Sequence, residues 1–169
     1  MLIQDVSTIL RITPRRWESL ASALPAELLW RKPARREWSA LECLQHLVDT
    51  ERYVFPVRVG CFLAGQDFPA FDPDRQGTVG KAQPEPLELA GELNRLRIAS
   101  MELLEKITQA DLSRRAVHRE LGPVTLEEML NEWAAHDLMH TVQAERALMQ
   151  SFIASCGPWQ VYFKDHWAG

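Results

Sequence analysis

Residues 125–152 read TLEEMLNEWAAHDLMHTVQAERALMQSF and predict one long amphipathic helix. Apolar and small side chains recur every three or four positions, which is the spacing of one helix face. The side chains on this face include Met129, Trp133, Ala144 and Ala147. Thr125 can cap the N-terminus, and Glu127 and Glu128 follow in the first turn, where they complement the positive end of the helix dipole. The Gly-Pro pair at 157–158 is expected to stop the helix after about Phe152.

A second helix is predicted from Ser39 to about Leu63. Ser39 is followed three residues later by Glu42, which is the pattern of a capping box. Pro56 lies within this helix, and we expect a kink there because proline lacks the amide hydrogen that the helix requires. The basic connector at residues 31–37, RKPARRE, is expected to be a solvated loop because charge runs usually face water.

Two further helices are predicted at residues 2–24 and 87–107. In the first, Thr13 and Pro14 have the form of a cap followed by proline, so we expect a kink or a restart there. No strand-like alternation is evident, and residues 114–123 are expected to form an extended or turning connector. The Pro- and Gly-rich residues 65–86 predict a long irregular connection, which in a compact domain is often a lid over a site.

The composition is that of a globular protein, with 46% apolar and 25% charged residues among 169. It excludes disordered and low-complexity chains, since enough apolar surface is present to bury a core. Together with the helical segments it predicts an all-α four-helix bundle with long connections and a short C-terminal tail. The whole chain, residues 1–169, is expected to be a single domain, with its aromatic tail folded back on the body.

Charge and cysteine content exclude several classes of partner. The formal net charge is −4, which gives no positive field for a nucleic-acid backbone. No run approaches the ~18 apolar residues of a membrane span, and the N-terminus does not have the pattern of a leader. The cysteines, three in number, are too few and too scattered for a disulfide framework. We therefore expect a cytoplasmic protein without a membrane partner.

Histidines supply the candidate chemistry. His136 and His140 are one helical turn apart, so their rings lie within ~40° on one face and can grip one metal ion. That face is apolar, and His46 lies near the edge of the apolar stripe of the second helix. A buried imidazole without a partner costs a few kcal/mol, which a shared divalent cation would offset. The alternative is that each interior histidine is hydrogen-bonded to a neighbouring polar group.

Other polar residues near these histidines have weaker support. Asp49, one turn after His46, could orient that imidazole or accept a proton, and Gln143 could hydrogen-bond a bound water or substrate. For Glu42 the capping box is the better account. Cys43 is expected to pack in the core rather than bind a metal. Residues placed outside the metal set or left open are His118, His166 and Arg97.

Two segments resemble the signatures of a known family. Residues 38–47, WSALECLQHL, with DTER at 49–52, are similar to the second helix of the DinB/YfiT-like superfamily. Residues 122–126, GPVTL, leading into HDLMHTVQ at 136–143, resemble its fourth helix. The resemblance spans nearly the whole chain. It implies a four-helix bundle with two long connections and one divalent metal ion bound by three histidines, which here are His46, His136 and His140.

The resemblance also bears on activity. Characterised members of the superfamily use zinc, nickel or other divalent ions, with manganese and iron as further candidates, and a low-molecular-weight thiol such as bacillithiol or mycothiol. We therefore expect a metal-dependent S-transferase or hydrolase acting on a small molecule, and a homodimer by the same analogy. A second hypothesis is a non-catalytic, stress-related metal-binding protein that forms dimers. A third is a helical interaction module that binds no ion.

Overall fold

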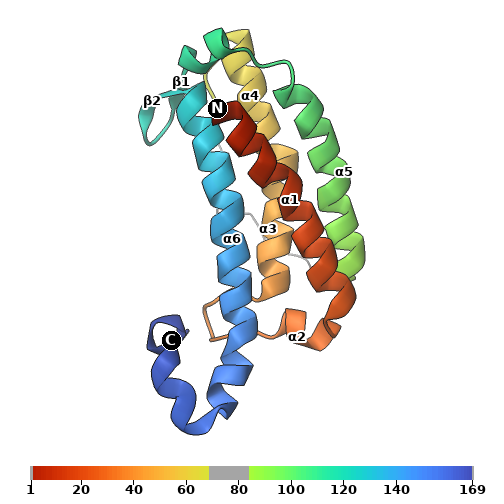
Figure 1. Cartoon of the computed structure of the whole chain (residues 1–169). Coiled ribbons are helices and arrows are strands. Elements are labelled where there is room, and N and C mark those ends of the chain that lie inside the picture. The colour runs from red at the N-terminus through yellow and green to blue at the C-terminus, as the bar shows by residue number, and fades with distance from the viewer. Residues whose placement is uncertain (1, 69–83, 169) are drawn as a thin grey trace.

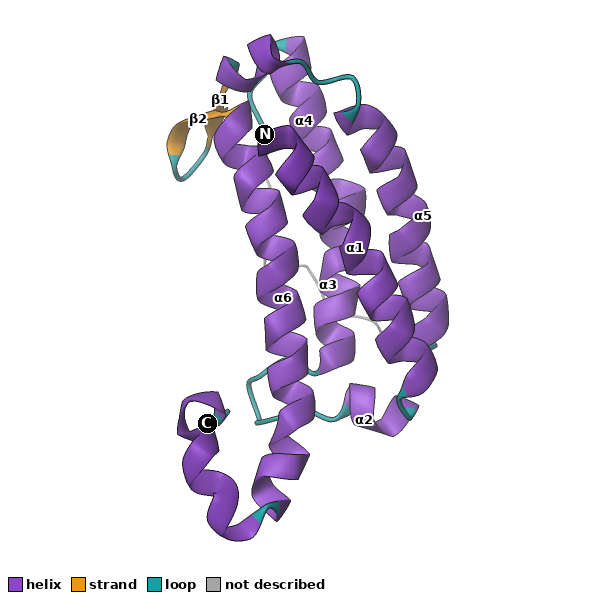
Figure 2. Ribbon diagram, viewed as in Figure 1, coloured by secondary structure: helices purple, strands orange, loops and turns teal. Residues whose placement is uncertain are grey.

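The computed structural model describes residues 2–68 and 84–168. Within them the chain is almost entirely helical, with one small hairpin (Figure 2). The elements are α1 (Leu2–Ala23), α2 (Ala26–Trp30), α3 (Ala40–Tyr53), α4 (Phe55–Ala64), α5 (Pro86–Leu104), η2 (Gln109–Ser113), β1 (Arg115–His118), β2 (Gly122–Thr125), α6 (Leu126–Ser155) and η3 (Gly157–His166). The predicted lid lies mostly outside the described residues.

The long helices form the predicted four-helix bundle (Figure 1). α1 packs against α5 and α6, and α3 packs against the same two helices, so that α1 and α3 lie on one diagonal. α1 and α6 run in one direction, whereas α3, α4 and α5 run in the other (Figure 1). Helices that follow each other along the chain are therefore not always neighbours, which is why long connections are needed. In the described part of the chain, no helix combines the length and apolarity needed to cross a bilayer.

Local capping signals define the two helices that carry the candidate histidines. The Ser39 side chain accepts a hydrogen bond from the Glu42 amide, and the Glu42 carboxylate accepts one from the Ser39 amide. Thr125 and Glu128 make the same reciprocal pair at the start of α6. These four residues satisfy amides that have no partner within the helix. Both N-termini lie where the sequence predicts them.

Pro14 and Pro56 have different effects on the helices that contain them. α1 continues through Pro14, so the predicted restart is wrong. Because Pro14 has no amide hydrogen, the carbonyl of Leu10 loses its helical donor, and Arg97 Nη1 donates to it instead at 2.9 Å. At Pro56 the chain breaks completely rather than kinks: α3 ends before Val54, and Pro56 lies in the first turn of α4, where an amide is not required.

The expectation that no strands form is also wrong. Residues 115–118 and 122–125 pair as an antiparallel hairpin, with Ala116 opposite Val124. Each strand has four residues, too few to reveal an alternating pattern. Gly122 has a φ of +75°, a left-handed conformation that glycine adopts without steric cost. The hairpin packs beside α4 at the end of the bundle.

The C-terminal tail folds back as predicted, and it packs against α6 (Figure 1). Arg146 Nε and Gln150 Nε2 both donate to the carbonyl of His166, at 3.0 and 2.8 Å. The aromatic side chains of η3 remain largely exposed, with Tyr162 at 78% and Trp159 at 66%. The tail is thus held by its backbone rather than by apolar burial.

The core is divided along the bundle axis. One apolar cluster surrounds Trp133 and Phe55, whose rings stack with centroids 5.0 Å apart, and the other surrounds Trp17 and Leu44. Buried polar residues lie between the two clusters on every helix of the bundle. This polar layer consists of Thr13, Thr50, Glu51, Arg97, Ser100, Asp137 and Thr141.

Candidate metal centre

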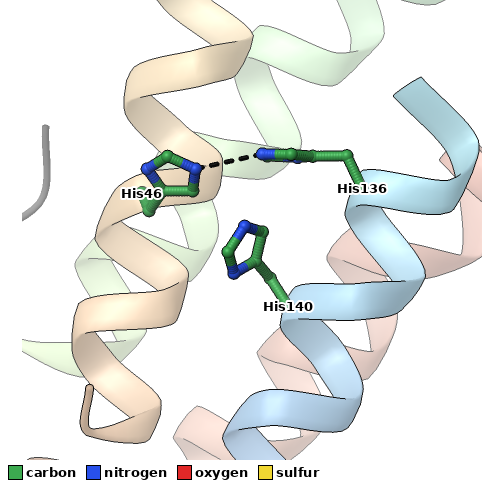
Figure 3. A group of neighbouring side chains, drawn as sticks. All are labelled: His46, His136 and His140. Atoms are coloured by element: carbon green, nitrogen blue, oxygen red, sulfur yellow. Dashed lines mark hydrogen bonds between the residues drawn. The ribbon is translucent and has the colours of Figure 1, made fainter. Parts of the chain in front are cut away.

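Three histidines converge between α3 and α6 (Figure 3). His46 comes from α3, and His136 and His140 come from α6, one turn apart. We call this group the histidine cluster. The Nε2 atoms of His46 and His136 lie 3.0 Å apart, and the ring of His140 lies 4.5 Å from each of the other two rings. One ring nitrogen from each histidine can be chosen so that all three lie within 4.8 Å of one another.

These distances fit a common ion. Nitrogens bound to one tetrahedral zinc ion at about 2.0–2.1 Å lie about 3.4 Å apart, close to the 3.0 Å between the Nε2 atoms of His46 and His136. Imidazoles that share one ion at about 2 Å per bond have ring centroids roughly 5 Å apart, and the centroid of His46 is 5.0 Å from that of His136 and 4.5 Å from that of His140. The cluster is therefore compatible with a metal ion, whose identity the geometry leaves open.

The second nitrogens of the rings are unequal. His140 Nδ1 is 2.8 Å from the amide oxygen of Gln143; because that oxygen only accepts, Nδ1 carries the proton and Nε2 keeps a free lone pair. The Nδ1 atoms of His46 and His136 are buried and have no hydrogen-bond partner. Buried polar atoms are rarely left unsatisfied, so these two atoms are compatible with a functional site, although the indole nitrogens of Trp17, Trp30 and Trp133 also have no partner.

Burial keeps the imidazoles neutral. Desolvation, followed by the charge of His140, lowers the pKa of His46 from 6.5 to about 4. Desolvation, the neighbouring imidazoles and the guanidinium groups of Arg97 and Arg58 lower the pKa of His136 to about 3. Desolvation also lowers the pKa of His140, although the bond with Gln143 opposes the shift. At neutral pH all three rings therefore offer lone pairs, as metal binding requires.

Aromatic side chains enclose the cluster. Trp38 stacks against His140 with ring centroids 5.6 Å apart and lies 4.9 Å from His46. Phe55 meets His136 edge-on at 5.2 Å. Trp38 is half-buried and packs against the apolar core as well as against the cluster. Apolar walls lower the local dielectric and strengthen any charge interaction inside.

The two predicted helper residues differ in their placement. Gln143 contacts the cluster directly through the ring nitrogen of His140, and its hydrogen bond to a bound water or substrate stays a prediction. Asp49 accepts a hydrogen bond from Gln45 Nε2 at 3.0 Å, and the Nδ1 atom of His46 has no bonding partner, so Asp49 does not orient that ring. A role for Asp49 as a proton acceptor stays a prediction.

The remaining candidates lie where expected. Cys43 is fully buried, and burial raises the pKa of its thiol to about 12, so it packs as an apolar side chain. His118 contacts Arg58 Nη2 at 3.3 Å and is not part of the histidine cluster. His166 lies in η3, where its carbonyl holds the tail against α6.

A second buried polar group lies beside the cluster and was missed by sequence reasoning. Arg97 Nη1 and Nη2 contact the two carboxylate oxygens of Asp137 at 2.7 and 3.2 Å, and Nη2 forms an ion pair with Glu51 at 2.9 Å. We call Glu51, Arg97 and Asp137 the buried triad; each side chain is at most 3% exposed. The available signal was charge at core-facing positions: Glu51 follows Leu47 by one turn on the buried face of α3.

Comparison with known proteins agrees with this architecture. Solved structures that match are YfiT from Bacillus subtilis, described as a probable metal-dependent hydrolase with an unusual four-helix bundle topology, and the DinB-like protein YjoA from Bacillus subtilis. YfiT has a TM-score of 0.77 and 17% identity, over 89% of this chain and 87% of its own. YjoA has a TM-score of 0.58 and 18% identity, over 87% of this chain and 92% of its own. At such identities the likeness shows the fold.

The family assignment comes from the sequence profile. No curated protein sequence is significantly similar to this chain. Residues 9–144 match the profile of the DinB superfamily, which covers most of the bundle and all three clustered histidines. The resemblance carried by the segments around His46 and His136 is thereby confirmed, and the chain belongs to the DinB superfamily.

Proposed function

We propose that this protein binds one divalent metal ion through His46, His136 and His140 and is a metal-dependent enzyme acting on a small electrophilic substrate. The observation that carries the proposal is the convergence of three neutral imidazoles from two helices, with two Nδ1 atoms buried and unsatisfied. Zinc and nickel are the first candidates, because imidazole nitrogen suits both. Four-coordinate binding by three protein ligands leaves one position open.

The bound ion would lower the pKa of a coordinated water toward ~7 or stabilise a coordinated thiol as its thiolate. The chain's own residues prepare the site for this. Gln143 fixes the proton of His140 on Nδ1, so that Nε2 points its lone pair at the ion. Trp38 and Phe55 exclude bulk water from one side of the cluster. We propose that the nucleophile is water or a low-molecular-weight thiol, giving a hydrolase or an S-transferase.

Metal analysis of protein prepared without an affinity tag tests the binding step. We expect close to one equivalent of divalent metal in the wild type and very little in His136→Ala, because two imidazoles rarely hold such an ion against competing buffer. Cys43→Ala is the matched control, since it removes a metal-ligand type one turn from His46 that the proposal assigns to packing. Equal, negligible metal in wild type and His136→Ala would support hydrogen-bonded core histidines without an ion.

Activity separates an enzyme from a metal-stabilised scaffold. The metal-loaded protein would be assayed with monochlorobimane across several low-molecular-weight thiols, and with a panel of ester and amide substrates without thiol. Conjugation that depends on metal supports the S-transferase, and hydrolysis without thiol supports the hydrolase. No metal-dependent turnover across both panels would favour the non-catalytic alternative, in which the ion only stabilises the bundle.

We also propose that the protein forms a homodimer. Large apolar side chains are exposed along the outer side of α6, including Met139 at 54% and Val142 at 64%. Contiguous exposed apolar surface of this kind commonly marks a protein interface. Light scattering coupled to size exclusion would give twice the mass of 19.4 kDa, and a monomer at micromolar concentration would contradict the proposal.

A further inference from the structure

The buried triad carries an excess of negative charge. Two carboxylates, Glu51 and Asp137, share the single guanidinium of Arg97, which leaves a net charge of −1 when both are ionised. The fourth contact of Arg97 is the neutral carbonyl of Leu10, freed by Pro14. Burying even a balanced ion pair is costly, and an unbalanced one costs more. Joining the helices by the triad alone would therefore cost free energy that an apolar contact would not.

The rest of the polar layer does not supply the missing positive charge. Its other members are hydroxyl groups, and each is engaged by a carbonyl of its own helix. The pairs are Thr13 with Ile9, Thr50 with His46, Ser100 with Leu96, and Thr141 with Asp137. Among the described residues of the layer, Arg97 is the one cation facing the two carboxylates. When both carboxylates are ionised, the described residues of the layer therefore leave the excess charge without an offset.

The histidine cluster is the neighbouring part of the core and interacts with the triad electrostatically. Asp137 lies between His136 and His140 in sequence, and Glu51 lies one turn beyond Leu47 on the helix that carries His46. The negative charge of Asp137 raises the pKa of His140, an effect smaller than those of desolvation and of the bond with Gln143. The positive charge of Arg97 lowers the pKa of His136, an effect smaller than those of desolvation and of the neighbouring imidazoles. In a buried site such interactions are weakly screened.

Resting on the proposed metal binding, we propose that the buried triad is the counter-charge of the histidine cluster. Three neutral imidazoles leave a divalent ion its full charge of +2, and the excess carboxylate behind them offsets part of it. The triad's net charge thus raises the affinity for a dication without adding an anionic ligand. The ion's open coordination position consequently remains available, whereas a directly bound carboxylate would occupy one.

The test compares Glu51→Gln with Glu145→Gln by zinc affinity, measured in competition with a chromophoric chelator at neutral pH. Glu51 and Glu145 each lie five residues after a cluster histidine, but Glu145 is exposed and pairs with Arg16 on the surface. Glu51→Gln keeps the size of the side chain and one acceptor oxygen for Arg97, and it removes the excess charge. We expect about tenfold weaker zinc binding in Glu51→Gln and no measurable change in Glu145→Gln.

A second variant separates charge from shape. Glu51→Gln combined with Arg97→Gln restores the net charge of −1, now carried by Asp137, and is expected to recover most of the lost zinc affinity. A merely structural role predicts instead that the double variant binds zinc no better than the single one. Urea unfolding of the metal-free Glu51→Gln protein gives an independent readout: its midpoint should stay equal or rise, because burial raises the pKa of Glu51 and disfavours its charge.

The outcomes distinguish this inference from the proposed function. If the wild type binds zinc and Glu51→Gln binds it equally well, the counter-charge is overturned and the metal site stands. If the affinity loss in Glu51→Gln is not recovered in the double variant, or if Glu145→Gln loses as much, the effect is not the buried charge and the inference is again overturned. If the wild type binds no divalent ion, both proposals fail.

Discussion

The histidine cluster and the buried triad lie side by side between the same helices, and their buried polar groups differ in charge and in the partners they bind. In the cluster the rings are neutral, and two Nδ1 atoms have no hydrogen-bond partner. In the triad the groups are charged, and Arg97 makes contacts to Glu51, Asp137 and the Leu10 carbonyl from three other helices. The cluster presents ring nitrogens that can bind a ligand, whereas the charged groups of the triad pair with one another, although Glu51 Oε1 and Arg97 Nε have no hydrogen-bond partner.

The difference shows how a small bundle can support a site inside its core. Unsatisfied imidazoles cost stability and would collapse or rearrange if the helices could slide. The triad ties α1, α3, α5 and α6 at the level next to the cluster, so the positions of the rings are set by strong, directional contacts. The triad fixes the positions of the helices at one level, and the cluster holds its ring nitrogens in place at the next.

Removing Arg97 should have the largest effect on the difference between the triad and the cluster. In Arg97→Met the two carboxylates remain buried without a counter-ion, and we expect the free energy of unfolding to fall by about 3–5 kcal/mol. Urea unfolding of the metal-free protein would measure the loss. Arg16→Met removes an arginine from an exposed pair with Glu145 and should cost no more than about 1 kcal/mol. Similar losses in the two variants would mean that the triad does not tie the helices together.

Acidification should lower the stability of the folded protein through the histidine cluster. Its histidines have pKa values lowered from 6.5 to about 4 for His46 and about 3 for His136, so below pH 6.5 the unfolded chain binds more protons than the folded one. Stability therefore rises with pH in this window and is lost on acidification toward pH 4. We expect a loss of about 1 kcal/mol per pH unit for each imidazole in metal-free protein.

The check is a series of urea unfolding curves between about pH 7 and pH 5. The double variant His46→Ala with His136→Ala should show a clearly shallower dependence, because its two lowered pKa values are gone. A slope unchanged in the double variant would assign the acid sensitivity to other groups, with His140, whose pKa burial also lowers, the first to test.

The smallest expected effect concerns His140, the ring of the cluster whose Nδ1 atom is held by a hydrogen bond. Gln143→Leu removes the acceptor of His140 Nδ1, so the ring can turn and change its tautomer. We expect about tenfold weaker zinc binding with little change in metal-free stability. Gln150→Leu, which loosens the tail on the same helix, serves as the control and should bind zinc normally. Unchanged affinity in Gln143→Leu would show that the bond does not orient the ring.

Much of the local structure could be predicted from the sequence because it depends on residues within one or two turns. Ser39 and Glu42 predict the start of α3, and Thr125 with the acidic first turn that follows it predicts the start of α6. The spacing of His136 and His140 places both rings on one face whatever surrounds the helix. The hairpin at 115–125 escaped prediction because strands of four residues are defined by their partner rather than by their own pattern.

What the sequence by itself determined is thus the helices, their caps and the pair of imidazoles on α6. The tertiary structure alone decided that His46 lies beside His136 and His140 and that Trp38 packs against the cluster. It also decided that Arg97 is buried rather than extended to solvent. Helix formation and capping are local, whereas these contacts depend on the packing of helices far apart in the chain. Arg97 is the clearest case, since its burial needs a carbonyl released by Pro14 and carboxylates from two other helices.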